Sequence, residues 1–173
     1  MKRQTRVVIV GGGFGGVKTA LELAKHHDFL ITLVTADTTF NYYPALYETA
    51  SGHSRVISSM PIGELIANKP IQMIKGEATK LDRTKKILTL KSRKKLSYDV
   101  LVLSLGSITN YFGIKGLAEN SHTVKSLERA EALKAHLQDQ LIRAHSPDLN
   151  YVVVGAGPTG IEFSGALPGY IHK

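Results

Sequence analysis

Two glycine-rich stretches have the residue types and spacing that bind the pyrophosphate of a dinucleotide. The first is Gly11-x-Gly13-x-x-Gly16 and the second is Gly155-x-Gly157-x-x-Gly160. In such a turn the first glycine permits the tight bend and the second lets the backbone approach the phosphates. The third lets the following helix pack against the strand, and the helix N-terminus offers free N–H groups to the anion. We therefore expect two dinucleotide-binding turns in one chain.

The elements around the first turn predict a β-α-β unit. Residues 7–10 are four consecutive apolar β-formers, which is typical of a strand buried on both faces of a parallel sheet. The predicted helix after the turn has one apolar face, made of Val17, Ala20, Leu21 and Ala24. Residues 29–35 predict the second parallel strand.

An acidic residue about 20 positions past the glycines normally binds the ribose hydroxyls. Thr35 occupies that position by spacing, and Asp37 follows two residues later. We expect either Thr35 to accept a ribose hydrogen bond or Asp37 to reach back to the ribose.

The middle of the chain predicts a loop, a short helix and an antiparallel region. Residues 40–52 form an aromatic stretch, interpreted as a loop that either carries function or packs locally through Phe40, Tyr42 and Tyr47. Residues 60–66 predict a short helix with proline at its start. The period then changes, and residues 71–81, 86–90 and 95–98 predict short strands of an antiparallel meander.

Residues 98–107 predict another strand buried on both faces, ending in a small-residue turn that a cofactor could approach. A loop is expected over residues 110–119. Ser126 is a candidate N-cap for a long helix that ends at residues 145–148. Its predicted apolar face consists of Leu127, Ala130, Leu133, Leu137 and Leu141.

The second turn repeats the strand-glycine-helix pattern, with residues 151–154 as the expected strand. The sequence ends at Lys173, inside the helix that follows, whereas a complete nucleotide domain needs several more β-α units. We therefore expect this chain to be a fragment of a longer protein.

The composition narrows the chemistry. The chain contains no cysteine, which excludes disulfides, zinc thiolate sites and dithiol redox motifs within these 173 residues. Its histidines have no metal-ligand spacing, so no metal site is expected. No apolar run approaches the roughly 20 residues of a membrane span, and a cytoplasmic protein is expected.

The net charge of +8 is concentrated in one segment. Its cations are Lys75, Lys80, Arg83, Lys85, Lys86, Lys91, Arg93, Lys94 and Lys95. No aromatic residue lies among them, so nucleic-acid binding by base stacking is not indicated. The segment is interpreted as a solvated β-ribbon, and the alternative is attraction to an anionic membrane surface.

Together these patterns resemble a known group. The two glycine turns, the meander and the segment Tyr98-Asp99-x-Leu101-Val102-x-x-x-Gly106-Ser107 are similar to the flavoprotein superfamily with two dinucleotide-binding units. Residues 41–52, 109–116 and 154–162 resemble type II NADH dehydrogenases, the non-proton-pumping NADH:quinone oxidoreductases. The resemblance covers the whole chain but only the N-terminal part of the family's length.

The resemblance implies an α/β protein with a Rossmann-like FAD/NAD(P)-binding fold. A parallel sheet and an antiparallel β-meander would be followed by the start of a second Rossmann-like unit. The implied domains are an FAD-binding domain over residues 1–125, a linker helix over 126–148 and the start of an NAD(P)H-binding domain over 149–173.

The resemblance also implies the site residues. FAD would be held by Gly11, Gly13, Phe14, Gly15, Gly16, Thr35, Ala36, Ala78, Ser104, Leu105 and Gly106, and NADH or NADPH by Gly155, Gly157, Thr159 and Gly160. Glu162 matches a family glutamate near the nicotinamide and flavin and is the one implied catalytic residue. Its alternative role is that of an ordinary first-turn glutamate, favoured by the helix dipole.

The implied substrates are NAD(P)H and quinone. The family would attach to the inner face of the cell membrane through a C-terminal part beyond this chain, and a homodimer is compatible with the resemblance. Two alternatives stay open: another FAD/NAD(P)H reductase, such as a sulfide:quinone reductase, and an inactive nucleotide-binding fragment. Disulfide reductases are disfavoured because they need a dithiol.

Overall fold

The computed structural model describes residues 3–143 and 150–171. The chain divides into two units, which are described separately here. The first unit comprises Met1–Phe40 and Met60–Ser107, and the second comprises Asn41–Ser59 and Ile108–Lys173.

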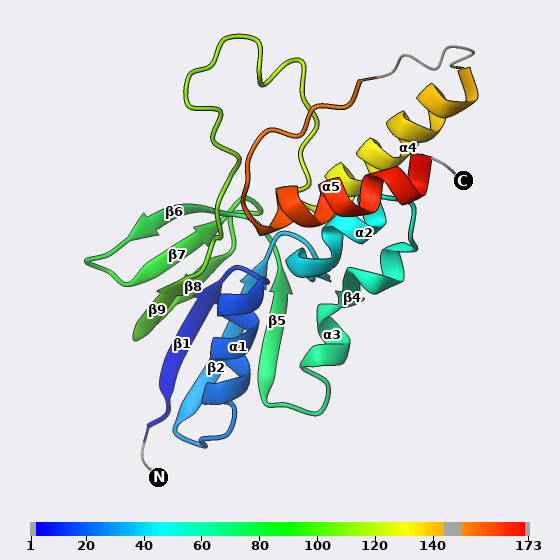
Figure 1. Cartoon of the computed structure of the whole chain (residues 1–173). Helices are drawn as coiled ribbons and strands as arrows, with labels where there is room; N and C mark the ends of the chain where they lie inside the picture. The colour runs from blue at the N-terminus through cyan, green and yellow to red at the C-terminus, as the bar shows by residue number, and fades with distance from the viewer. Residues whose placement is uncertain (1–2, 144–149, 172–173) are drawn as a thin grey trace. The chain divides into compact units, whose positions relative to one another are not determined.

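A four-stranded parallel sheet forms the centre of the first unit (Figure 1). Its strands are β1 (Thr5–Val10), β2 (Phe29–Thr35), β5 (Ile71–Lys75) and β9 (Val100–Leu103), in the order β5-β2-β1-β9. Helix α1 (Phe14–Leu23) connects β1 to β2, which pair in parallel from Thr5 opposite Phe29 to Val10 opposite Val34. This arrangement confirms the predicted β-α-β unit.

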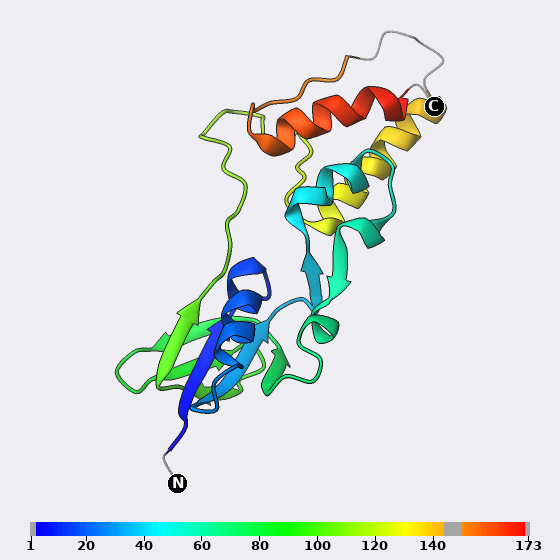
Figure 2. The same cartoon turned by 60° about the horizontal axis from the view of Figure 1, so that its bottom comes forward.

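The two faces of the parallel sheet are covered by different elements. Val7 and Ile9 pack with Val17 and Ala20 of α1, while Val8 and Val10 pack with an antiparallel sheet on the other face. That second sheet contains β6 (Ala78–Asp82), β7 (Ile87–Leu90) and β8 (Lys95–Ser97). Figure 2 shows α1 packed over one face of the parallel sheet, beside β1 and β2. Because both faces are covered, the continuous apolar run of β1 is explained.

Two predictions for this unit are wrong in part. Residues 71–75 were expected in the antiparallel meander, but β5 pairs in parallel with β2, and Gly76 and Glu77 separate it from β6. Residues 98–107 were expected to be buried on both faces, but Val100 is 46% exposed and Leu103 is 58% exposed. β9 has one neighbour, β1, among the described strands, so its outer edge is uncovered there.

An ion pair joins the start of β1 to the start of β9. The Arg6 guanidinium donates to both carboxylate oxygens of Asp99, at 3.0 Å from Nε and 2.9 Å from Nη2. The Arg6 backbone N–H adds a third hydrogen bond, 2.8 Å to Oδ2. These bonds hold the pKa of Asp99 well below its usual range, because they favour the charged carboxylate.

The aromatic stretch was predicted to be a loop, but it forms several short elements. These are β3 (Thr39–Asn41), the 3-10 turn η1 (Tyr43–Ala45), α2 (Leu46–Ala50) and the 3-10 turn η2 (Arg55–Ile57), followed by β4 (Ser59–Pro61), which pairs with β3. Phe40 is buried and Tyr47 packs on an apolar cluster, as local packing predicts, but Tyr42 is 46% exposed. The short helix predicted next is confirmed as α3 (Ile62–Leu65).

Three helices form the core of the second unit. These are α2, α4 (Leu127–Arg143) and α5 (Pro158–Ile171), and they enclose Leu46, Leu127, Leu133, Leu137 and Phe163. The predicted N-cap is confirmed, because the Ser126 hydroxyl accepts from the Arg129 N–H at 3.3 Å. The expected helix end at residues 145–148 lies outside the described residues, and the domain boundaries expected at 125/126 and 148/149 stay a prediction.

Residues 151–154 were expected to be a strand, and this prediction is wrong for the described structure. They have extended chain but no strand pairing, and Val152 and Val154 are 83% and 72% exposed. A parallel strand needs a neighbour for its backbone groups, and no described segment of the second unit supplies one.

The described part of the chain contains no helix long and apolar enough to cross a membrane. Within the same residues, no cluster of three or more histidine or acidic side chains could hold a metal ion.

Candidate dinucleotide-binding turns

The first glycine turn lies at the carboxyl end of β1 and opens α1. Gly11 has a φ of +118°, and a methyl group added there would overlap the carbonyl oxygen of Ser104. A methyl group on Gly16 would overlap the carbonyl oxygen of Gly11. These two glycines therefore allow the helix, the turn and the chain after β9 to approach one another closely.

Gly13 differs from Gly11 and Gly16 because open space lies in front of it. A methyl group added there would meet nothing within 4 Å, although Gly13 is the residue from which α1 begins. The Gly13 carbonyl accepts the first helical hydrogen bond, from the Val17 N–H at 2.9 Å. The space in front of Gly13 and the free N–H groups of the first turn fit a pyrophosphate. Gly15 and Phe14 complete the turn, and Phe14 packs edge-on against Phe40 at 4.9 Å between ring centroids.

Thr35 lies at the carboxyl end of β2, next to the first turn. It is 6% exposed, and its hydroxyl donates to the Asp37 carbonyl at 2.6 Å. One Asp37 carboxylate oxygen accepts from the Thr39 N–H at 3.0 Å. Ala36 and Asp37 are exposed beyond the strand. The Thr35 hydroxyl thus shapes the turn that presents Ala36 and Asp37.

The expected flavin-side residues follow β9 at the same sheet edge. The Ser104 hydroxyl donates to the Val10 carbonyl at 3.1 Å, which joins the ends of β1 and β9. Leu105 is 71% exposed, and Gly106 has a φ of +74°. Ala78 is half-buried at the start of β6. Since parallel strands end at one edge, the structure brings Gly11, Ser104 and Thr35 together there.

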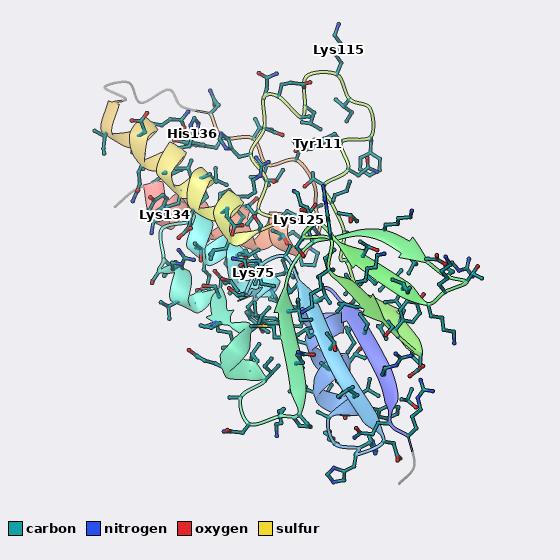
Figure 3. The ribbon with its side chains drawn as sticks, turned by 180° about the vertical axis from the view of Figure 1, so that it is seen from behind. Lys75, Tyr111, Lys115, Lys125, Lys134 and His136 are labelled. Atoms are coloured by element: carbon teal, nitrogen blue, oxygen red, sulfur yellow. The ribbon has the colours of Figure 1, made fainter. Side chains whose placement is uncertain are left out.

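The glycine pattern of the first turn did not single out Gly12 or Lys75, which both neighbour Thr35. A methyl group on Gly12 would lie 2.5 Å from the Thr35 hydroxyl oxygen, so this glycine is also required by close packing. Lys75 is the register partner of Thr35, and the next residue, Gly76, donates its N–H to the Thr35 carbonyl at 2.8 Å. Figure 3 shows Lys75 at the end of β5. Sheet order could have found Lys75, but the sequence pattern placed it in the meander.

The second glycine turn has the same geometry as the first. Gly155 has a φ of +113°, and a methyl group on Gly160 would overlap the Gly155 carbonyl oxygen. The Ile161 N–H donates to the Gly157 carbonyl at 3.1 Å, just as Val17 does to Gly13. Methyl groups on Gly155 and Gly157 would meet nothing within 4 Å. The turn therefore has the backbone geometry of the first turn although residues 151–154 form no strand.

An open cavity of about 790 Å³ lies in front of this second turn, within the second unit. This volume is in the range of small-molecule sites. Its lining includes Gly155, Gly157, Thr159 and Gly160, with Thr109, Asn110 and Tyr111 from the preceding loop and His136 and Gln140 from α4. Tyr111 and His136 are both labelled in Figure 3. Hydrogen-bonding groups and apolar side chains thus share one cavity with the turn.

Glu162 is exposed in the first turns of α5, and Tyr47 of α2 lies within its electrostatic reach. Burial raises the pKa of the Tyr47 hydroxyl, and the Glu48 and Glu162 carboxylates raise it further. A Tyr47 that stays protonated can donate a hydrogen bond. The sequence placed Tyr47 in a stretch that either carries function or packs locally, but it did not link Tyr47 to Glu162, because the contact between α2 and α5 is long-range.

The relatives of this chain include bacterial type II NADH:quinone oxidoreductases. A type II NADH:quinone oxidoreductase of Mycobacterium tuberculosis is 32% identical over 178 residues, covering 95% of this chain and 38% of the relative. The type II NADH:quinone oxidoreductase of Staphylococcus haemolyticus is 31% identical and covers 94% of this chain and 42% of the relative. The chain therefore spans about two fifths of the length of these relatives.

Solved structures of quinone-linked and NADH-binding oxidoreductases are also similar to this chain. The structure of NDH2 from Plasmodium falciparum in complex with NADH matches with a TM-score of 0.86 and 25% identity, over 99% of this chain and 38% of that one. The sulfide:quinone oxidoreductase of Aquifex aeolicus matches with a TM-score of 0.74 and 31% identity, over 80% of this chain and 33% of that one. The profile of the pyridine nucleotide-disulphide oxidoreductase family matches residues 5–172, and the chain belongs to this family.

Proposed function

We propose that this chain is the dinucleotide-binding part of an FAD-dependent NADH:quinone oxidoreductase of type II. The observation that carries the proposal is the presence of two glycine turns with matching geometry, each opening a helix and each with open space before its central glycine. The names of the two bacterial relatives above support the choice of NADH and quinone as substrates.

The residues of the first turn fit FAD, because Gly13 leaves room for a pyrophosphate and α1 directs its N–H groups there. Gly11, Gly15 and Gly16 would shape that turn. Thr35 and Ala36 would contact the adenosine ribose, and the backbone of Ala78 the adenine. Ser104, Leu105 and Gly106 would line the flavin side.

FAD, when bound in the first turn, would supply the two-electron redox chemistry between NADH and quinone. The second turn and the cavity before it would hold the pyrophosphate of NADH or NADPH. Glu162 would orient the nicotinamide end, and Tyr47 would hold a proton beside Glu162. The membrane surface, reached through a longer form of the chain, would present the quinone.

The test is a visible absorption spectrum of the purified chain and of a longer form of the protein, if the reading frame continues. Bound flavin should give a yellow protein that NADH bleaches without oxygen and that a soluble quinone restores. Glu162→Gln should slow bleaching while leaving the flavin spectrum intact. A protein that takes up no flavin in either form would contradict the proposal.

The likeness to the Aquifex aeolicus enzyme favours a sulfide:quinone oxidoreductase as the second candidate. Both reactions end on quinone and differ in the electron donor. Bleaching by sulfide but not by NADH would select this alternative. Flavin binding without bleaching by either donor would indicate a nucleotide-binding fragment without activity.

A further inference from the structure

The antiparallel sheet of the first unit concentrates most of the chain's positive charge. We call residues 78–97, which contain β6, β7, β8 and their two turns, the basic ribbon. It has eight basic side chains and one acidic one, a net charge of +7 against +8 for the whole chain. All eight are exposed: Lys80, Arg83, Lys85, Lys86, Lys91, Arg93, Lys94 and Lys95. The function proposed above uses none of them.

The register of the ribbon places cations on its outer face. Thr89 of β7 pairs with Lys80 on one side and Lys95 on the other, so all three side chains point the same way. Neighbouring strands are about 4.8 Å apart, which puts the two lysines roughly 10 Å apart. The opposite face packs Leu88 and Leu90 on the parallel sheet. The ribbon therefore has one anchored face and one charged face.

Few of these cations are neutralised by the protein itself. Lys91 pairs with Glu77 at 3.0 Å, and the Lys86 ammonium donates to the Asp99 carbonyl at 3.4 Å. Because that carbonyl is uncharged, the seven cations other than Lys91 form no ion pair with any described residue. They include both arginines and the outward pair Lys80 and Lys95. These exposed cations without an ion pair are therefore available to an anionic partner.

We propose that the basic ribbon binds the surface of an anionic phospholipid membrane. Six of its eight cations are lysines, which act as point charges on flexible stems and suit diffuse attraction to lipid headgroups. The ribbon contains no aromatic residue on which a nucleic-acid base could stack. The proposal goes beyond the oxidoreductase function and stands if that function fails, although a quinone is itself carried by membranes.

The experiment is co-sedimentation of the purified chain with vesicles. One set consists of phosphatidylcholine alone and the other of equal parts phosphatidylcholine and phosphatidylglycerol. We expect binding to the second set only, weakening steeply as salt is added, because the screening length falls from about 10 Å at 0.1 M to about 3 Å at 1 M.

Two matched double variants locate the surface. Lys80→Gln with Lys95→Gln should lower vesicle affinity by roughly 30-fold, at about fivefold for each cation near the membrane. Lys69→Gln with Lys115→Gln removes the same charge from exposed positions outside the ribbon and should lower it far less. Circular dichroism spectra of both variants establish that they are folded.

Three results would overturn the proposal. They are equal binding to both vesicle sets, equal losses in the two double variants, and stronger binding to duplex DNA than to anionic vesicles at the same salt. Flavin content is recorded on the same samples. A yellow protein that NADH bleaches but that does not bind vesicles contradicts only the membrane proposal. A protein that binds vesicles but takes up no flavin, either as this chain or in a longer form, contradicts only the oxidoreductase function.

Discussion

The two glycines Gly13 and Gly16 should respond to the same substitution in opposite ways. A methyl group on Gly16 overlaps the Gly11 carbonyl oxygen and lies 2.8 Å from the Ser104 hydroxyl oxygen, so backbone must shift. Such overpacking costs about 3 kcal/mol at the upper end of the usual range. Gly16→Ala should therefore lower the Tm by about 6–12 °C in a chain of this size.

Gly13→Ala should leave stability nearly unchanged, because its methyl group meets nothing and its φ of −85° suits any residue. Poorer helix capping and a less flexible unfolded chain each change stability by less than about 1 kcal/mol, in opposite directions. The affinity for FAD should instead fall, by about tenfold or more if the methyl group costs at least 1.4 kcal/mol of phosphate contact.

The assay combines thermal unfolding followed by circular dichroism with titration of flavin fluorescence. The reasoning about close packing is refuted if Gly16→Ala melts within about 2 °C of the parent, less than the shift expected from 1 kcal/mol. The placement of the pyrophosphate is refuted if Gly13→Ala binds FAD as tightly as the parent does.

Three further predictions concern stability. Asp99→Asn should lower the Tm at pH 7, because Arg6 depresses the folded pKa of Asp99. The stability that Asp99 contributes is present above its unfolded pKa of about 3.9 and is lost as pH falls through the folded pKa. Thermal melts of parent and variant should therefore converge at low pH. Ser126→Ala should cost about 1 kcal/mol in urea unfolding and Ser126→Gly only a few tenths, through loss of the α4 cap; equal costs would argue against capping. Leu33→Ala should cost about 2–5 kcal/mol, because Leu33 of β2 is completely buried in the apolar cluster that β1 and α1 also line. A smaller loss would mean that the surrounding side chains collapse into the space.

The sequence predicted well those features that depend on residues close together in the chain. Gly11 to Gly16 predicted the turn and helix, because turn, close approach and capping lie within six residues. Ser126 predicted a helix start for the same reason. The structure of the aromatic stretch was harder to predict, because its short helical turns depend on packing rather than on periodicity.

Features that depend on distant neighbours were harder to predict. Residues 71–75 have the composition of a strand in either sheet, and only pairing with β2 decides between them. Residues 151–154 have the composition of a buried strand, yet no described segment pairs with them. In the candidate site, the spacing of the sequence predicted the glycines. Lys75 was identified only from the strand register, and Tyr47 only from its interaction with Glu162.

The second glycine turn also has a consequence for the order of folding. Gly155 and Gly160 are five residues apart, and their close approach does not depend on strand pairing of residues 151–154. A contact of such short sequence separation closes with little loss of loop entropy, so it can form early. The turn is then encoded by residues close together in the chain, whereas α5, which contains Pro168, depends for its stability on packing with α2 and α4.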